Sequence, residues 1–193
     1  MMESGRLYEF AFRAHLAEEA LERVSRQTRG AAGGLAEKIE ARLPLDSLDE
    51  SMVAAARLMA AVYITVAAFE NSARQLISRT LLEEVGANWW ETRVSAAIRR
   101  KVETRRAEEA KFKWHKTRGG DPIDYTDLGD LGNIIGQNWP QFEAYIPSLE
   151  WVKSLFDVIE RSRNVIMHSG SLEFEDIERV GINVRDWIKQ VGV

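Results

Sequence analysis

The chain has 193 residues, of which 45% are apolar and 29% charged, and its net charge is −4. This length and composition fit a single soluble domain with a sizeable core. Because the sequence contains no cysteine, disulfides, thiolate metal sites and a cysteine nucleophile are excluded, as is typical of a reducing cytoplasm. The first ten residues lack the apolar run of a signal peptide, so we expect a cytoplasmic protein.

Helices are predicted along most of the chain, in six segments: residues 7–28, 35–43, 50–84, 88–116, 149–168 and 174–190. Glycine and proline separate the early segments, at residues 29–34, at Pro44 and at Gly86. Asn88 is the expected N-cap of the fourth helix, with Glu91 as its capping-box partner.

Residues 52–69 contain a single charge, Arg57, and are almost long enough to cross a membrane. Seven of these eighteen residues are alanine, which gives little hydrophobic drive for insertion. We therefore predict a central buried helix and no membrane contact.

Residues 117–148 collect glycine, proline and aspartate, and this composition predicts mostly loop with short helical turns. Aspartates recur there at every third position, which is not calcium-loop spacing, so we interpret them as turn formers and N-caps. Ser148 is the expected cap of the fifth helix, Ser169 and Gly170 its end, and Trp187 the anchor of the last helix. The prediction is an all-α bundle of four to five main helices in one domain, residues 1–193, with an N-terminal segment at 1–43 and a core at 49–193.

The fourth helix runs through a basic stretch, residues 93–118, with a net charge of +7. Its cations could hold an RNA backbone, or could form a solvated face that pairs with Glu103, Glu108 and Glu109. Trp114 could stack on a base, although tryptophan at such a position more often packs its loop onto the bundle. The candidate RNA-binding residues are Arg99, Arg100, Lys101, Arg105, Arg106 and Trp114.

Arg163 interrupts an apolar row on the fifth helix, where a guanidinium group costs desolvation unless it is paired or reaches water. Asn164 and His168 are four residues apart and share a face, whereas Arg163 and His168 are separated by roughly 140° around the helix. From spacing alone, a structural ion pair of Arg163 with Glu70 or Glu160 is favoured over a catalytic site.

The segment RNVIMH, residues 163–168, resembles the arginine–histidine motif of the HEPN superfamily, whose all-helical domains include many metal-independent ribonucleases. Further segments resemble the Swt1-like branch of that superfamily: FENSARQLI at 69–77, GANWWE at 86–91, KWHKTRGGDPIDYTDLGDLGNII at 113–135 and NWPQF at 138–142.

The resemblance implies RNA cleavage by attack of the ribose 2′-hydroxyl on the neighbouring phosphate, without metal or cofactor. His168 would act as the proton acceptor and Arg163 would stabilise the phosphorane. Asn164 would orient the histidine or a phosphate oxygen, and Glu70, at an acidic position of this branch, would support either group.

The resemblance also implies a homodimer, formed through the fifth helix, in which two motifs face one cleft. The expected setting is antiphage defence or toxin action, with RNA as substrate and an antitoxin or defence protein as a further partner. A non-catalytic HEPN scaffold, or a module that binds RNA or nucleotide, is the alternative.

Overall fold

The computed structural model describes residues 34–192. Every regular element in this range is a helix, which confirms the predicted all-α class. The helix predicted at residues 7–28 lies outside the described residues. Two compact units are present, one ending at Val53 and the other beginning at Ala54. The single-domain organisation stays a prediction.

The first unit contains a helix over residues 34–40, the 3₁₀ helix η1 (Leu45–Ser47) and the beginning of α2. Asp49 lies directly before α2, and its Oδ1 accepts a hydrogen bond of 3.0 Å from the backbone N–H of Ser51. This bond satisfies a donor that the first helical turn leaves free. The predicted start of the long helix is therefore confirmed.

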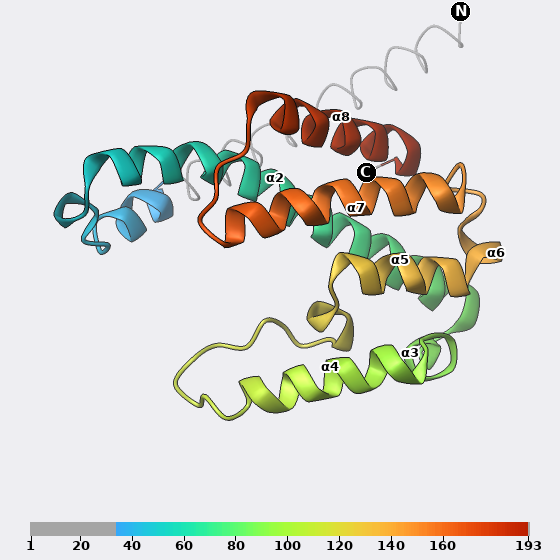
Figure 1. Ribbon diagram of the computed structural model, residues 1–193. Helices are drawn as coiled ribbons and strands as arrows, with labels where there is room; N and C mark the ends of the chain where they lie inside the picture. The colour runs from blue at the N-terminus through green and yellow to red at the C-terminus, as the bar shows by residue number, and fades with distance from the viewer. Residues whose placement is uncertain (1–33, 193) are drawn as a thin grey trace, which may run out of the picture. The chain divides into compact units, whose positions relative to one another are not determined.

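The second unit is built from the rest of α2 (Glu50–Val85) and seven further elements. These are α3 (Trp89–Arg93), α4 (Ala96–Glu109), η2 (Pro122–Tyr125), α5 (Leu128–Gln137), α6 (Trp139–Phe142), α7 (Leu149–Met167) and α8 (Phe174–Val191). Figure 1 shows α8, α7, α5 and α4 in that order across the unit, with α2 running behind them. The core lies where α2, α5, α7 and α8 meet.

Trp187 is the centre of the aromatic core and attaches α8 to the bundle, as predicted. It is fully buried, and its ring lies edge-on to Phe69 of α2 at 5.4 Å between centroids. The indole Nε1–H donates a hydrogen bond of 3.0 Å to the Ser72 hydroxyl. A buried tryptophan needs such a partner for its single polar group.

Helix α5 corrects the prediction that residues 117–148 are mostly loop. It is a ten-residue core helix, and its main packing partner is α7. A Cβ on Gly132 would lie 3.5 Å from the Phe156 ring, and one on Gly136 would lie 3.4 Å from Leu149. The glycines that suggested turns thus allow close approach of two helices.

The helix predicted over residues 88–116 is also corrected, because the structure divides it into α3 and α4. Asn88 makes no side-chain cap bond, whereas the Ser95 hydroxyl accepts the N–H of Ile98 and caps α4. Side chains distant in sequence stabilise the break. The amide of Asn138 donates to the Arg93 carbonyl at 3.0 Å, and Gln137 accepts the Ser95 N–H at 3.3 Å.

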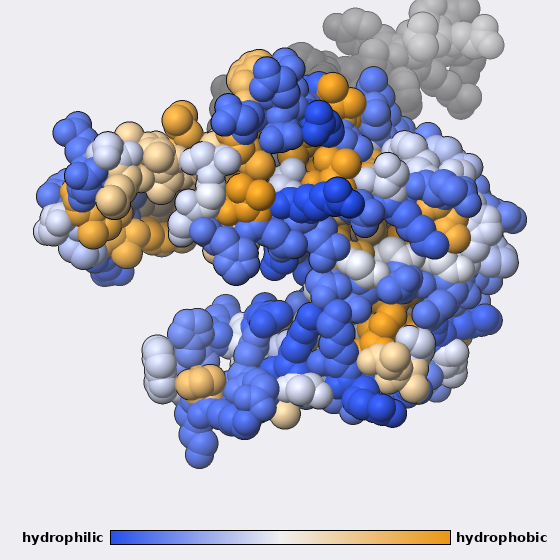
Figure 2. All heavy atoms as spheres, in the orientation of Figure 1, coloured by the Kyte–Doolittle hydropathy of each residue, from blue (hydrophilic) through white to orange (hydrophobic). Residues whose placement is uncertain are grey.

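The prediction of a central buried helix at residues 52–69 is wrong for its first half. By length and composition alone α2 could cross a membrane, yet only 22% of its most apolar 18-residue window is buried. Leu58 and Ile64 are among the exposed apolar side chains, and Figure 2 shows apolar surface over this part of the helix. Buried side chains recur along one face of α2 only from Met59 onward.

We expect Trp187→Ala to lower the free energy of unfolding by about 3–5 kcal/mol, because it leaves a large cavity among α2, α7 and α8. Ser72→Ala should cost roughly 1 kcal/mol, since it removes only the partner of the indole N–H. Urea denaturation followed by far-ultraviolet circular dichroism measures both. Equal losses for the two variants would contradict the assigned role of the ring.

Candidate active site

Arg163 of α7 forms an ion pair with Glu70 of α2. The Arg163 Nε lies 3.0 Å from Glu70 Oε1, and the arginine side chain is 35% exposed. Glu70 is only 8% exposed, so its charge needs a partner in the bundle. The structure thus brings together two of the four predicted catalytic residues, and the apolar row on α7 tolerates Arg163 because Glu70 faces it.

A second arginine, Arg74, completes this cluster, although it was not among the predicted site residues. Its Nη2 lies 3.2 Å from Glu70 Oε2 and donates to the Thr126 carbonyl at 3.0 Å. Glu70 and Arg74 are four residues apart on one helix, a spacing that favours ion pairs and could have revealed the contact. Arg74 therefore links α2 to the residue before the α5 N-terminus.

Arg163 and Glu70 form an ion pair but no hydrogen bond. The buried Oε1 of Glu70 lies close to Arg163 Nε, yet it accepts no hydrogen bond. Only Nε of Arg163 approaches the carboxylate. Among the described residues, none forms a hydrogen bond or ion pair with the two terminal amino groups of Arg163. These groups are the donors with which arginine binds phosphate bidentately.

Asn164 and His168 are exposed at the last turn of α7. His168 is the C-cap, and its backbone N–H bonds to the Asn164 carbonyl at 3.2 Å. Within residues 34–192 no hydrogen bond or ion pair joins the side chains of His168 and Arg163, in agreement with their separation of roughly 140° around the helix. The chain therefore presents Arg163 toward α2 and His168 toward solvent.

The backbone after His168 is held by a left-handed residue that is not glycine. Ser169 has φ 61°, and the Gly170 N–H bonds to the Val165 carbonyl at 2.9 Å. This arrangement is a Schellman motif. A Cβ on Gly170 would lie 2.9 Å from the same carbonyl oxygen. The predicted helix end at Ser169 and Gly170 is confirmed, and it fixes the cap position of His168.

We expect Ser169→Gly to raise the free energy of unfolding by about 0.5–1 kcal/mol, because glycine adopts positive φ without strain. Gly170→Ala should lower it by about 1–3 kcal/mol, since the methyl group meets the Val165 carbonyl. Thermal unfolding of the two variants gives these values. A destabilising Ser169→Gly would show that the serine side chain, and not the backbone, holds the turn.

Two of the predicted RNA-binding cations of α4 are engaged in ion pairs with the aspartates that cap α5. Lys101 Nζ lies 2.7 Å from Asp127 and 3.0 Å from Asp130, and Arg105 contacts Asp127 at 2.9 Å. The predicted pairing with neighbouring glutamates holds only for Glu108 and Glu109, which bind Lys111 and Arg118.

The other candidates on α4 differ from one another. Arg100 is exposed, and the Arg99 Nε is buried without a hydrogen-bond partner. The guanidinium group of Arg106 lies 5.5 Å from the centroid of the Tyr125 ring. Trp114 is 83% exposed, so the expectation that it packs its loop onto the bundle is wrong.

Asp127 and Asp130 form the capping box of α5, which confirms their interpretation as N-caps. The Asp130 N–H donates to Asp127 Oδ1 at 2.8 Å, and the Asp127 N–H donates to Asp130 Oδ2 at 3.2 Å. Burial acts to raise the pKa of Asp127, but hydrogen bonds from Lys101 and Arg105 outweigh it and hold that pKa well below its usual range. Burial and the charge of Asp127 raise the pKa of nearby Glu160, whereas Arg163 opposes this shift.

We expect Asp127→Asn to lower the free energy of unfolding by about 1–2 kcal/mol at pH 7, because asparagine still caps α5 but loses the charged bonds to Lys101 and Arg105. A carboxyl group whose pKa is lower in the folded state stabilises the fold at every pH above its pKa in the unfolded state, which is near 4. This stabilisation is lost as the pH falls toward the folded-state pKa. The difference in free energy of unfolding between wild type and Asp127→Asn, measured by urea titration, should therefore become smaller below about pH 5. Asp176→Asn, in an exposed pair with Arg179, is the matched control and should change stability by less than about 0.5 kcal/mol. A difference that does not depend on pH would contradict the pKa assignment.

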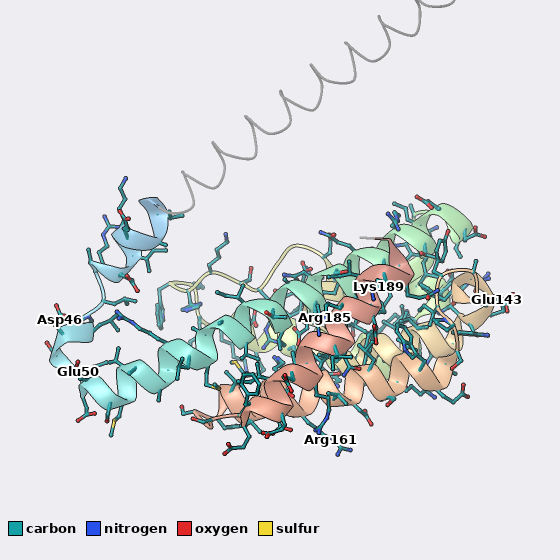
Figure 3. The ribbon with its side chains drawn as sticks, turned by 90° about the horizontal axis from the view of Figure 1, so that it is seen from above. Asp46, Glu50, Glu143, Arg161, Arg185 and Lys189 are labelled. Carbon is teal, nitrogen blue, oxygen red and sulfur yellow. The ribbon has the colours of Figure 1, made fainter. Side chains whose placement is uncertain are left out.

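A pocket of about 400 Å³ lies between α7 and α8, on the face of α7 opposite Arg163. Ser154, Asp157, Arg161 and Arg179 contribute its polar lining. Figure 3 shows Arg161 at the outer side of the bundle. Neither Arg163 nor Glu70 lines this pocket, so it is separate from the charged cluster.

Comparison with known proteins gives one family. The family model described as Swt1-like HEPN matches residues 66–192, which include Glu70, Arg163 and His168. No curated protein and no solved structure matches the chain.

Proposed function

The chain belongs to the Swt1-like HEPN family, and on that premise we propose that it is a metal-independent endoribonuclease. The observation that carries the proposal is the arrangement at the end of α7. Arg163 is held by a buried carboxylate. Asn164, the next residue, and His168, five residues after Arg163, are exposed to solvent. In this reaction the ribose 2′-oxygen attacks phosphorus, the bond to the 5′-oxygen breaks, and the products carry a 2′,3′-cyclic phosphate and a 5′-hydroxyl.

Arg163 is suited to stabilise the charge that develops on the phosphorane. Glu70 engages its Nε and leaves its terminal amino groups for two phosphate oxygens. A guanidinium group whose direction is fixed before the substrate binds needs less reorganisation in the transition state. Glu70 and Arg74 are therefore positioning residues in this proposal.

His168 is suited to accept the proton of the 2′-hydroxyl, because the reference pKa of histidine, about 6.5, lies near neutral pH. Asn164 precedes it by one turn and shares its face, so the amide can orient the imidazole or a phosphate oxygen. Since His168 and Arg163 of one chain lie on different sides of α7, we propose a homodimer in which the two motifs complete each other's site.

A non-catalytic HEPN scaffold is the second candidate, and one observation favours it. The ion pair of Arg163 with Glu70, extended by Arg74, is also what a purely structural role requires. We further propose a cytoplasmic role in antiphage defence or as a toxin, with an antitoxin or defence protein that controls activity.

The test is cleavage of total RNA in excess EDTA, with analysis of the product ends. Wild type should leave cyclic phosphate ends. His168→Ala should reduce the rate by about 10²-fold or more, and Arg163→Ala by about 10²–10³-fold. DNA should resist cleavage because it lacks the 2′-hydroxyl.

Ser154→Ala, in the separate pocket between α7 and α8, is the control and should cleave as wild type. Thermal unfolding distinguishes catalytic loss from misfolding, since His168 is an exposed cap and its removal should leave stability nearly unchanged. Equal cleavage by wild type and His168→Ala would exclude the nuclease assignment. Absence of cleavage by folded, dimeric wild type would favour the scaffold.

A further inference from the structure

The loop after α4 alternates cationic and aromatic side chains. Residues 111–116 read KFKWHK and contain no acidic residue. Phe112 is 56% exposed and Trp114 is 83% exposed. Two large aromatic rings exposed close together among cations on one loop form a patch suited to contact another molecule, unlike a single exposed apolar side chain. We refer to residues 111–116 as the aromatic loop.

The aromatic loop is attached to the bundle on both sides. Before its tip, the Phe112 N–H bonds to the Glu109 carbonyl at 3.0 Å, and the His115 N–H bonds to the Phe112 carbonyl at 3.1 Å. After the tip, Arg118 pairs with Glu109 and its guanidinium group lies 5.9 Å from the centroid of the Tyr125 ring. The rings of Trp114 and His115 pack edge to face at 5.4 Å. The loop thus presents its aromatic side chains from a supported backbone.

The charge of the aromatic loop is available for a ligand, unlike that of Lys101 and Arg105 on α4. Lys101 and Arg105 are matched by the aspartates that cap α5. Lys113 and Lys116, in contrast, form no ion pair with any residue that the structure describes, and both are exposed. Only Lys111 within the loop has an acidic partner, Glu108 at 2.6 Å. Unmatched cations beside exposed rings suit a polyanion that also carries flat apolar faces.

We propose that the aromatic loop binds unpaired bases of single-stranded RNA, with Trp114 as the stacking residue and Lys113 and Lys116 as phosphate contacts. Base–aromatic stacking combined with lysine contacts to the backbone is the general mode of single-strand recognition. A duplex hides the faces of its bases, so the proposal names unpaired RNA as the substrate class. It rests on the proposed function for the identity of the polymer as RNA.

The position of the aromatic loop agrees with such a role. In Figures 1 and 3 the loop that follows α4 and the C-terminal end of α7, where His168 lies, are at the same end of the second unit. Figure 2 shows a mostly hydrophilic surface over α4 and its loop, hollowed toward α2 and α7. A strand held by Trp114 can therefore extend along hydrophilic surface toward the motif.

The test is fluorescence anisotropy of the full chain with a labelled 2′-O-methyl oligouridine of about twelve nucleotides. The methyl group blocks attack by the 2′-oxygen, so binding is measured whether or not the protein cleaves RNA. Trp114→Ala should raise the Kd at least about fivefold. Trp114→Phe should keep the Kd within about twofold of wild type. Trp114→Leu should raise the Kd as Trp114→Ala does, because leucine is apolar but cannot stack on a base.

Two controls make the result specific. Phe174→Ala removes another exposed aromatic residue, 69% exposed on α8, and should leave the Kd unchanged. Lys113→Gln with Lys116→Gln should weaken binding and reduce its salt dependence. All variants change exposed side chains, so thermal unfolding should match wild type.

Unchanged binding by Trp114→Ala, equal binding by Trp114→Leu and wild type, or equal affinity for an RNA duplex of the same length would each overturn the proposal. The proposal would also be overturned if Trp114→Ala lost binding to anionic vesicles, or to an acidic protein, but still bound oligouridine like wild type. Loss of oligouridine binding in Trp114→Ala, combined with no RNA cleavage by wild type, would support the aromatic loop and reject the nuclease.

Discussion

The carboxylate of Glu70 lies almost completely inside the bundle and faces two arginines. Its burial would be costly without partners, and Arg74 and Arg163 supply them from α2 and α7. Through Arg74 the cluster reaches the Thr126 carbonyl, directly before the α5 capping box. Two guanidinium groups share this one carboxylate, and Arg163 also interacts electrostatically with nearby Glu160. The direction of Arg163 thus depends on an interaction that is built into the fold.

A second charge cluster shows why the net charge of residues 93–118 is a poor guide to how much positive charge is free to bind a ligand. Lys101 and Arg105 neutralise Asp127 and Asp130, and this pairing attaches α4 to the start of α5. Half-buried ion pairs of this kind stabilise the packing of elements and leave little charge for a ligand. The cations that remain available lie elsewhere, at the exposed Arg100 and in the aromatic loop.

Local chemistry predicted three helix boundaries, at Asp49, Ser148 and Ser169, because caps act within one turn. It was wrong about the cap at Asn88, whose side chain makes no cap bond. The motif on α7 and the pairing of Glu70 with Arg163 were within reach of the sequence. The break between α3 and α4 was not, since Asn138 and Gln137 stabilise it from more than 40 residues away. Helix α5 was missed because its glycines indicate turns locally, whereas their role is close packing against α7. The exposure of Trp114 and of the first half of α2 could not be predicted, because it depends on tertiary contacts that the hydrophobic periodicity of the sequence does not reveal.

The two residues of the motif differ in how strongly the fold needs them. Arg163 balances a buried carboxylate, whereas His168 is an exposed cap whose side chain has no hydrogen-bond or ion-pair partner among residues 34–192. In a lineage released from selection for cleavage, replacement of His168 would be nearly neutral, but replacement of Arg163 would still be opposed through stability. A relative that has lost nuclease activity is therefore expected to keep the arginine and to lose the histidine. The presence of the arginine alone is then weak evidence of activity.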